Sequence, residues 1–414
     1  MSLQFITGNS GNGKTKYLFN RIVKEAKANP RDNYLVIVPE QFTMQTQRQL
    51  VDLSENKAIM NIDVLSFKRL AYRVFDELGI TNLTVLEETG KNLVLRKLAA
   101  QEADKLGVIG RNLNRIGYIS EVKSLLSELV QYNISPEELG RYIASGRLSD
   151  ALSDKLKDVL VLYEAFEKFM QDKYITAEEI LNVLCNVAEE SAILRNSVIA
   201  FDEFTGFTPI QNQLIKKLFV ISKKIYVTLT IDCREDIFKS RGMQELFDMP
   251  KRTVKSLTEM AAFYGIEVEE PIILDKNYRL AENEELSFME QQLFRKRRCS
   301  FKKVPKHIHI DCLRDPKQEL TKIARRINEL VRNENLRYRD IAIVTGDVNI
   351  YAGYVREIFD KYNIPYFIDA TQEILFHPFI EFIRSIPDIA AQNFSQMRCS
   401  DFCGAALVSY WTVK

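Results

Sequence analysis

The segment that most constrains the fold is a glycine-rich stretch close to the N-terminus. A short apolar strand is predicted over Leu3–Thr7, and the sequence GNSGNGKT follows it at Gly8–Thr15. This spacing matches the phosphate-binding loop pattern of one glycine, four free positions and then Gly-Lys-Thr. Helical periodicity follows from Lys14 to Ala28. The start of the chain is therefore predicted to be a strand–loop–helix unit of an α/β fold.

The residues of this loop are suited to a nucleoside triphosphate. Glycines let backbone N–H groups close around phosphate oxygens, and the following helix adds its positive N-terminal end. Lys14 is predicted to reach the β- and γ-phosphates, and Thr15 to ligate Mg²⁺. The predicted ATP-binding residues of the loop are Gly8, Asn9, Ser10, Gly11, Asn12, Gly13, Lys14 and Thr15. The alternative is a glycine-rich turn that binds no ligand.

A second candidate site follows a later apolar strand. The sequence VIAFDEFTGFTPIQ, Val198–Gln211, places two acids at the C-terminal end of that strand. In a phosphate-loop protein this strand end lies beside the Mg²⁺ site. Asp202 is predicted to hold Mg²⁺ through water, and Glu203 to polarise the attacking water as a catalytic residue. The alternative is a solvated acidic turn.

Composition limits the class of protein. The chain has 414 residues, 46% of them apolar and 27% charged, which is enough for large globular cores. A net charge of +1 argues against a globally basic nucleic-acid binder but allows a local basic groove. Six scattered cysteines without a CxxC pair favour reduced thiols in a cytoplasmic protein. No membrane-length apolar run and no signal peptide are found, so no membrane partner is expected.

Strand and helix patterns divide the chain into regions. Short apolar strands alternate with helices in residues 1–86 and 194–285, which predicts one parallel sheet covered on both faces. Residues 87–193 show only helical periodicity and are predicted to be a helical insertion. Residues 286–392 are predicted to form a second, partial domain, and residues 393–414 are interpreted as an aberrant or truncated tail.

A basic run, Arg295–Lys303, lies between the two predicted αβ units and fits a solvated linker better than a phosphate contact. Strands are predicted at His307–Leu313 and Asp340–Gly346. Helices are predicted at Pro316–Arg332 and Ile350–Tyr362. This alternation is typical of a second αβ unit.

The order of motifs along the chain resembles superfamily 1 DNA helicases of the UvrD type. The glycine-rich loop comes first, and later a DEF sequence carries a glutamine nine residues after its aspartate. The other similar segments are VIVPEQFTMQTQRQL (Val36–Leu50), DVLSFKRLAYRVF (Asp63–Phe75), TIDCREDIF (Thr230–Phe238) and LDKNYRL (Leu274–Leu280). Within that superfamily, VPEQFT, DEFTGFTPIQ and FHPFIEFIRS most resemble the B-subunit family of AddAB (RexAB) helicase–nucleases. The resemblance covers residues 1 to about 392, as an N-terminal fragment.

This resemblance implies a RecA-like P-loop NTPase domain with a large helical insertion and a partial second RecA-like domain. It implies ATP and Mg²⁺ as cofactors, with Arg279 contacting the γ-phosphate as an ATP-binding and catalytic residue. It also implies contacts to single-stranded DNA, for which the candidates are Phe42, Thr43, Ser66 and Phe67. The two phenylalanines fit core packing equally well.

The resemblance further implies partners. These are an AddA-type motor and nuclease subunit in a heterodimer, DNA ends and single-stranded DNA, in double-strand-break processing and recombinational repair in a bacterial cytoplasm. The nuclease and the iron–sulfur cluster of the family lie near its C-terminus, and the cysteines of this chain match no such pattern. The cluster is therefore expected only in a C-terminal region outside these residues.

Three departures from UvrD-type motors affect the expected activity. Thr205 stands where those motors have a glutamine, Gly206 where they have an aspartate, and Glu235 aligns with their motif III glutamine. A carboxylate facing a polyphosphate repels it. We therefore expect ATP binding with slow or absent DNA-coupled hydrolysis. Two alternatives stay open: a nucleotide-gated DNA-scanning scaffold without hydrolysis, and an active superfamily 1 DNA translocase.

Overall fold

The structure is a computed structural model that describes most of the chain in two compact units, Met1–His307 and Ile308–Lys414. The described residues are 1–81, 84–108, 110, 117–146, 148–170, 174–240, 242–295, 299–370, 374 and 377–393.

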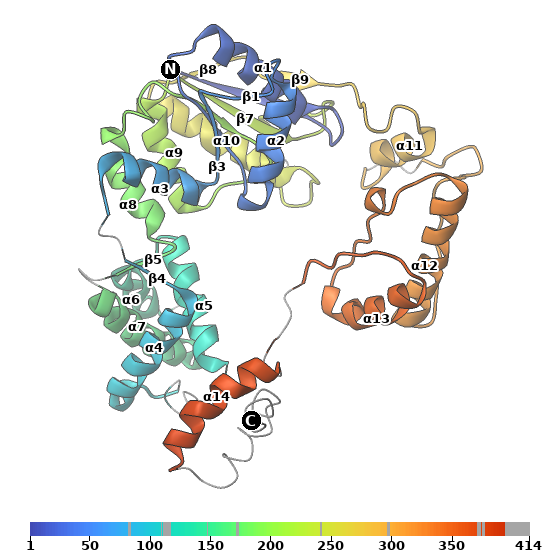
Figure 1. The fold of residues 1–414 in the computed structure, drawn as a ribbon. Helices are drawn as coiled ribbons and strands as arrows, with labels where there is room; N and C mark the ends of the chain where they lie inside the picture. Colours follow the sequence, from blue (N-terminus) through green and yellow to red (C-terminus); the bar gives the residue numbers. More distant parts are fainter. Residues whose placement is uncertain are drawn as a thin grey trace, which may run out of the picture. The chain divides into compact units, whose positions relative to one another are not determined.

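A parallel β-sheet forms the centre of the first unit (Figure 1). Its strands are β1 (Ser2–Gly8), β2 (Tyr34–Ile37), β3 (Ile62–Leu65), β6 (Val198–Phe201), β7 (Lys224–Thr230), β8 (Glu267–Val268) and β9 (Ile272–Leu274). The strand order is β3-β2-β6-β7-β1-β8, with β9 also pairing with β1, and every pairing is parallel. The predicted parallel α/β class is confirmed.

Helices cover both faces of this sheet because successive strand side chains point to opposite faces. Ile6 of β1 packs with α1 (Lys14–Ala28) and α2 (Thr43–Leu53). Phe5 belongs to the cluster on the other face, where the covering helices are α3 (Phe67–Leu78), α8 (Ile180–Val187), α9 (Pro209–Ile221) and α10 (Asp248–Phe263). Fully buried strands of this kind hold the strand ends in fixed positions.

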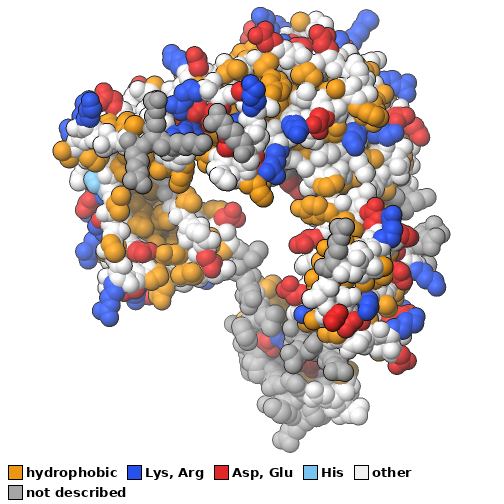
Figure 2. Space-filling model, turned by 180° about the vertical axis from the view of Figure 1, so that it is seen from behind, with side chains coloured by type: hydrophobic (Ala, Val, Ile, Leu, Met, Phe, Trp, Pro, Cys, Tyr) orange, Lys and Arg blue, Asp and Glu red, His pale blue; other side chains and the backbone are white. Residues whose placement is uncertain are grey.

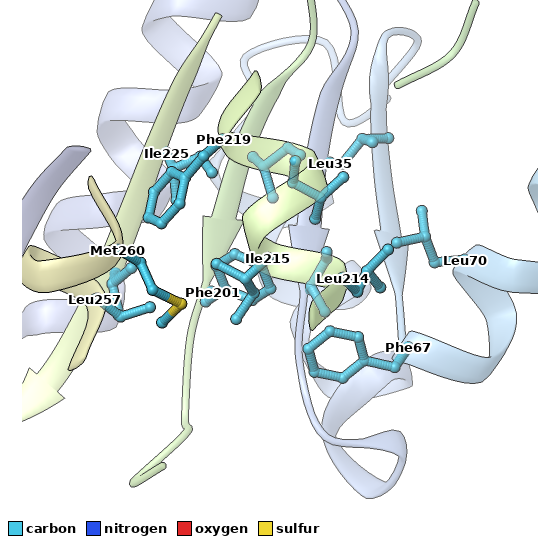
Figure 3. Packing of buried hydrophobic residues seen from close by; sticks show 14 of the residues in the cluster. Leu35, Phe67, Leu70, Phe201, Leu214, Ile215, Phe219, Ile225, Leu257 and Met260 are labelled. Atoms are coloured by element: carbon cyan, nitrogen blue, oxygen red, sulfur yellow. The ribbon is translucent and has the colours of Figure 1, made fainter. Parts of the chain in front are cut away.

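The core under α9 and α10 is tightly filled (Figure 3). Phe201 of β6 lies among Ile215 of α9 and Leu257 and Met260 of α10, and each of these side chains is at most 9% exposed. Since Phe201 directly precedes the acidic pair predicted as a site, this packing fixes the position of the acids.

A separate helical core is built from residues between β3 and β6. Its elements are β4 (Val85–Leu86), α4 (Glu88–Gln101), α5 (Tyr118–Gln131), α6 (Pro136–Ala144), α7 (Asp150–Met170) and β5 (Ile175–Thr176). Leu95, Leu126 and Leu162 are buried in this core. Leu184 of α8 packs instead in the sheet core, so α8 belongs to the sheet layer although it falls within the predicted insertion, 87–193. The helical core therefore ends near β5.

The second unit contains α12 (Pro316–Asn333), α13 (Val348–Lys361) and α14 (Pro378–Ala391). Leu320 and Ala324 of α12 pack against Ile358 and Phe359 of α13, and the helices predicted for these two positions are confirmed. Residues 394–414, most of the predicted tail, lie outside the described residues.

The strands predicted at His307–Leu313 and Asp340–Gly346 are wrong, because the structure has no β-strand in either segment. Ile310 is 95% exposed and Val344 is 94% exposed. A strand needs a neighbour for its N–H and C=O groups and a layer over its side chains, and the described part of this unit offers these segments neither.

Charged side chains are mixed on the surface. Figure 2 shows Lys and Arg side chains interspersed with Asp and Glu over the visible face, in keeping with the net charge of +1. Within the described ranges, none of the helices combines the length and the hydropathy that crossing a bilayer requires.

Candidate functional site

The glycine-rich loop joins β1 to α1 at the carboxyl edge of the sheet. Gly13, directly before α1, has a φ of 80°, and no side chain in the described part of the chain caps the helix start. Gly11 has a φ of 90°. L-residues rarely adopt these left-handed conformations, so glycine is needed at both positions. The uncapped N–H groups of α1 form an electropositive end suited to an anion.

Lys14 bends back over the loop. Its Nζ donates hydrogen bonds to the backbone oxygens of Gly8 and Asn9, both at 3.0 Å. Burial lowers the pKa of this ammonium, while the nearby carboxylates of Glu203 and Asp202 act in the opposite direction. The loop is therefore held by its own lysine, and an anionic ligand would compete for that lysine with two carbonyl groups.

The predicted acidic pair meets the loop at Thr15. Thr15 Oγ1 lies 3.3 Å from Asp202 Oδ1 and 3.3 Å from Glu203 Oε1. Thr228, on β7 between the two motif-bearing strands, donates a hydrogen bond to Asp202 Oδ1. The structure thus brings together the two sequence motifs that were predicted to share a site.

Asp202 is buried and only partly satisfied. Its side chain is 1% exposed, and Oδ2 has no hydrogen-bond partner among the described residues. Burial raises the pKa of Asp202, and repulsion from the Glu203 carboxylate raises it further. A carboxyl in this state is stabilised by a nearby cation.

Glu203 has an unusual backbone conformation, with a φ of 64°. Left-handed backbone in a residue with a side chain costs about 1–2 kcal/mol and is concentrated at functional sites. The turn directs the chain away from the strand end and leaves the Glu203 carboxylate beside Thr15.

The segment after β9 lies across the loop. Asn277 Nδ2 donates to Ser10 O at 3.0 Å, and the Tyr278 N–H donates to Gly11 O at 3.0 Å. Arg279 Nη1 lies 3.4 Å from Ser10 Oγ. A Cβ at Gly11 would come within 2.7 Å of Asn277 Oδ1, so the contact requires glycine. The predicted ATP-binding arginine is therefore held at the loop.

A cavity of about 740 Å³ opens between these elements. Its lining includes loop residues, both acids and Arg279, and also residues that were not predicted from the sequence, among them Lys16 and Phe19 of α1 and Gln49 and Asp52 of α2. Nothing in their sequence context distinguishes them from ordinary helix positions. They enter the site because α1 and α2 cover the same face of the sheet.

A second cavity of about 740 Å³ lies near α7 and α8 and is lined by several carboxylates, among them Glu137, Glu164, Glu167 and Glu179. A polyphosphate would be repelled there. The cavity beside the loop is the better candidate for an anionic ligand.

The structure gives Ser66 and Phe67, two predicted DNA contacts, roles in the fold. Phe67 is 7% exposed, and its ring stacks on that of Phe201 with centroids 5.8 Å apart (Figure 3). Ser66 caps α3, because its Oγ accepts a hydrogen bond from the Arg69 N–H at 3.3 Å. In this conformation Phe67 offers no free face for a base.

The other two predicted DNA contacts lie at the start of α2. Thr43 is buried, and its Oγ1 donates to Glu40 O at 3.0 Å. Phe42 is half-buried and packs against the core between the sheet and α1. DNA contact by these residues stays a prediction.

Two residues that were compared with helicase motifs also have structural partners. Gln211 forms a capping box with Thr208 at the start of α9. Glu235 lies 2.7 Å from Nζ of Lys251, a lysine that is 4% exposed. The Glu235 carboxylate is paired with Lys251 and is not among the described residues that line the cavity, so the structure lends no support to the interpretation that it faces a polyphosphate.

The fold and the site define a parallel α/β protein in which a glycine-rich strand–loop–helix unit faces two carboxyl groups. Residues 5–290 match the family described as ADDB, N-terminal, and the chain belongs to this family.

The chain is similar to proteins named as the B subunit of an ATP-dependent helicase/deoxyribonuclease. The relative from Lachnoclostridium phytofermentans is 37% identical over 99% of this chain and 36% of its own length. The relative from Clostridium tetani is 32% identical over 99% of the chain and 36% of its own length. The relative from Clostridium kluyveri is 32% identical over 95% of the chain and 34% of its own length. The chain thus spans just over a third of the length of these curated relatives.

Proposed function

We propose that this chain binds ATP with Mg²⁺ at the loop Gly8–Thr15, as the N-terminal part of the B subunit of an ATP-dependent helicase/deoxyribonuclease. The observation that carries the proposal is the meeting of Thr15, the neighbour of Lys14 on the loop, with Asp202 and Glu203 at the carboxyl edge of a parallel sheet. Ligands of open parallel sheets bind at this edge. The proposed fold is a RecA-like P-loop NTPase domain formed by residues 1–86 and 194–285.

The residues of the loop would bind the phosphates directly. The Lys14 ammonium exchanges the carbonyl groups of Gly8 and Asn9 for phosphate oxygens, which are stronger acceptors because they are charged. The uncapped N–H groups of α1 donate to the same anion. Arg279, held at Ser10, supplies a second positive charge next to the terminal phosphate.

The acids fit a magnesium ion. Mg²⁺ prefers oxygen ligands, and here the Thr15 hydroxyl lies beside the buried Asp202 carboxyl, which has an unpaired oxygen. No group of three or more His, Cys, Asp or Glu that could hold a metal occurs among the described residues, so phosphate and water oxygens complete the shell. When bound, the ion neutralises phosphate charge.

Hydrolysis is proposed to be slow. Glu203 is the residue available to orient a water molecule, and its carboxylate is shared with Thr15. Thr205 lines the cavity where UvrD-type motors have a glutamine, and its short hydroxyl reaches less far than an amide. DNA and a motor subunit of the AddA type in the bacterial cytoplasm are the proposed partners, with residues 286–392 as part of a second RecA-like domain.

The test is ATP hydrolysis by the purified protein with and without single-stranded DNA, beside direct measurement of Mg·ATP binding. We expect binding in the micromolar range with little DNA stimulation. Strong DNA-stimulated turnover would contradict the proposal of slow hydrolysis and would favour an active DNA translocase. Absence of Mg·ATP binding would contradict the proposed site.

A further inference from the structure

Asn9 of the phosphate-binding loop connects the loop to a helix far along the chain. The Asn9 side chain is 5% exposed. Its Oδ1 accepts the Cys233 N–H at 3.0 Å, and its Nδ2 donates to Glu290 Oε1 at 2.5 Å. The Cys233 N–H needs an acceptor, so the Asn9 amide nitrogen must face the Glu290 carboxylate. Glu290 lies on α11 (Glu284–Gln292).

The other end of α11 holds the segment that leads into the second unit. Glu285 is 9% exposed, and its two carboxylate oxygens accept the backbone N–H groups of Lys306 at 2.7 Å and His307 at 2.8 Å. His307 is the last residue of the first unit. One helix therefore contacts both the loop and the end of this unit.

A second anchor follows α11. Arg295 Nη2 lies 2.6 Å from Asp232 Oδ2, and Asp232 is buried just beyond β7. The Arg295 guanidinium also lies over the ring of Phe247, 5.2 Å from its centroid. The helix and the short segment that follows it, as far as Arg295, are thus attached to the carboxyl edge of the sheet at two points, Asn9 and Asp232.

We infer that α11 transmits the state of the phosphate-binding loop to the segment Lys306–His307. The inference rests on the proposed nucleotide binding. Lys14 Nζ holds the backbone oxygen of Asn9, and a bound phosphate takes that ammonium away. Asn9 then loses the hydrogen bond to its backbone oxygen, and the hydrogen bond from its Nδ2 to Glu290 weakens. As a result, the hydrogen bonds from the Lys306 and His307 N–H groups to Glu285 of α11 weaken as well. A contiguous hydrogen-bonded path of this kind can carry coupling between two sites.

Variants of Glu290 separate this coupling from a merely structural role. Glu290→Gln keeps an acceptor for Asn9 Nδ2 and should behave like the wild type. Glu290→Ala removes the acceptor and mimics the loosened state. Since coupling is reciprocal, Glu290→Ala should bind Mg·ATP about threefold more tightly than the wild type. Gln291→Ala, a change at the exposed neighbouring position, is the matched control.

The readout is hydrogen exchange of the backbone amides of Lys306 and His307 in the full chain, with and without Mg·ATP. Wild type and Glu290→Gln should exchange about fivefold faster when Mg·ATP is bound, whereas Glu290→Ala should already exchange at the faster rate without nucleotide.

Wild-type protein that binds Mg·ATP with unchanged exchange at these amides overturns the inference alone. Unchanged or weaker Mg·ATP binding by Glu290→Ala also overturns it. A wild type that does not bind Mg·ATP in a direct titration overturns the proposed function first, and the inference with it.

Discussion

Thr15 Oγ1 lies 3.3 Å from Asp202 Oδ1, although the two residues are 187 positions apart in the sequence. The contact depends on strand register. β7 pairs with β1 through Gly8 and Thr230 and with β6 through Phe201 and Val227, so the glycine-rich loop and the acidic pair leave the sheet at the same edge. The site is therefore a property of the assembled sheet and not of either motif by itself.

Removing the charge of Asp202 should stabilise the protein in the absence of nucleotide. Burial raises the pKa of this carboxyl in the folded state, so the protonated group stabilises the fold at acidic pH, and this stabilisation is lost as the pH rises through the folded-state pKa. The amide of Asp202→Asn does not ionise, so this variant should show a Tm higher than the wild type by about 2 °C at neutral pH. Differential scanning calorimetry with Asp76→Asn, an exposed position, as control checks the sign, and a lower Tm would contradict it. Mg²⁺-dependent ATP binding should fall in the same variant.

Gly11→Ala should disrupt the contact between the loop and the Asn277–Arg279 segment. A Cβ at Gly11 would lie 2.7 Å from Asn277 Oδ1 and 2.8 Å from Arg279 Cβ. Gly79→Ala is a matched control, because Gly79 has a φ of 70° and no atom of the described residues lies within 4 Å of an added Cβ. Both variants carry the left-handed strain of about 1 kcal/mol, so chemical denaturation should show a further loss only for Gly11→Ala. Equal losses would mean that the segment does not lie against the loop.

The backbone strain at Glu203 can be measured with two substitutions. Glu203→Ala and Glu203→Gly both remove the carboxylate, but only glycine accepts a φ of 64° freely. Glu203→Gly should therefore be more stable than Glu203→Ala by about 1 kcal/mol. Urea denaturation compares the two directly, and a more stable alanine variant would show that this turn is not left-handed in solution.

Glu235→Gln should lower stability without raising ATP hydrolysis. Lys251 is 4% exposed and relies on Glu235 at 2.7 Å and Glu245 at 3.1 Å, so removing one charge leaves a buried ammonium less well compensated. A loss of about 1–3 kcal/mol is expected. The control is Glu259→Gln, since Glu259 forms an exposed pair with Lys255 and should change little. Increased DNA-coupled hydrolysis in Glu235→Gln would favour the motif III interpretation instead.

Local patterns were sufficient for the parts of the fold that depend on local chain preference. Spacing and periodicity predicted the loop at Gly8–Thr15, the strands β1 and β6 that precede the two motifs, and helices α12 and α13. The strands β8 and β9 could not be predicted in this way, because they have two and three residues and exist through pairing with β1.

Long-range contacts account for the remaining differences. Apolar alternation suggests strands near Ile310 and Val344, but a strand forms only beside a partner, which periodicity does not report. The bond from Asn9 to Glu290 spans 281 positions and has no local signal. The sequence motifs therefore predicted which residues share the site, whereas the surrounding contacts required the structure.

The most direct test of the account is calorimetric titration of Mg·ATP into the wild type, Lys14→Ala and the exposed control Lys24→Ala on the same helix. Lys14 is the residue whose ammonium is predicted to leave the carbonyl groups of Gly8 and Asn9 for a phosphate. We expect binding by the wild type and by Lys24→Ala, and an affinity on the order of 100-fold weaker for folded Lys14→Ala. Equal affinity of Lys14→Ala and the wild type would show that nucleotide does not bind at this loop.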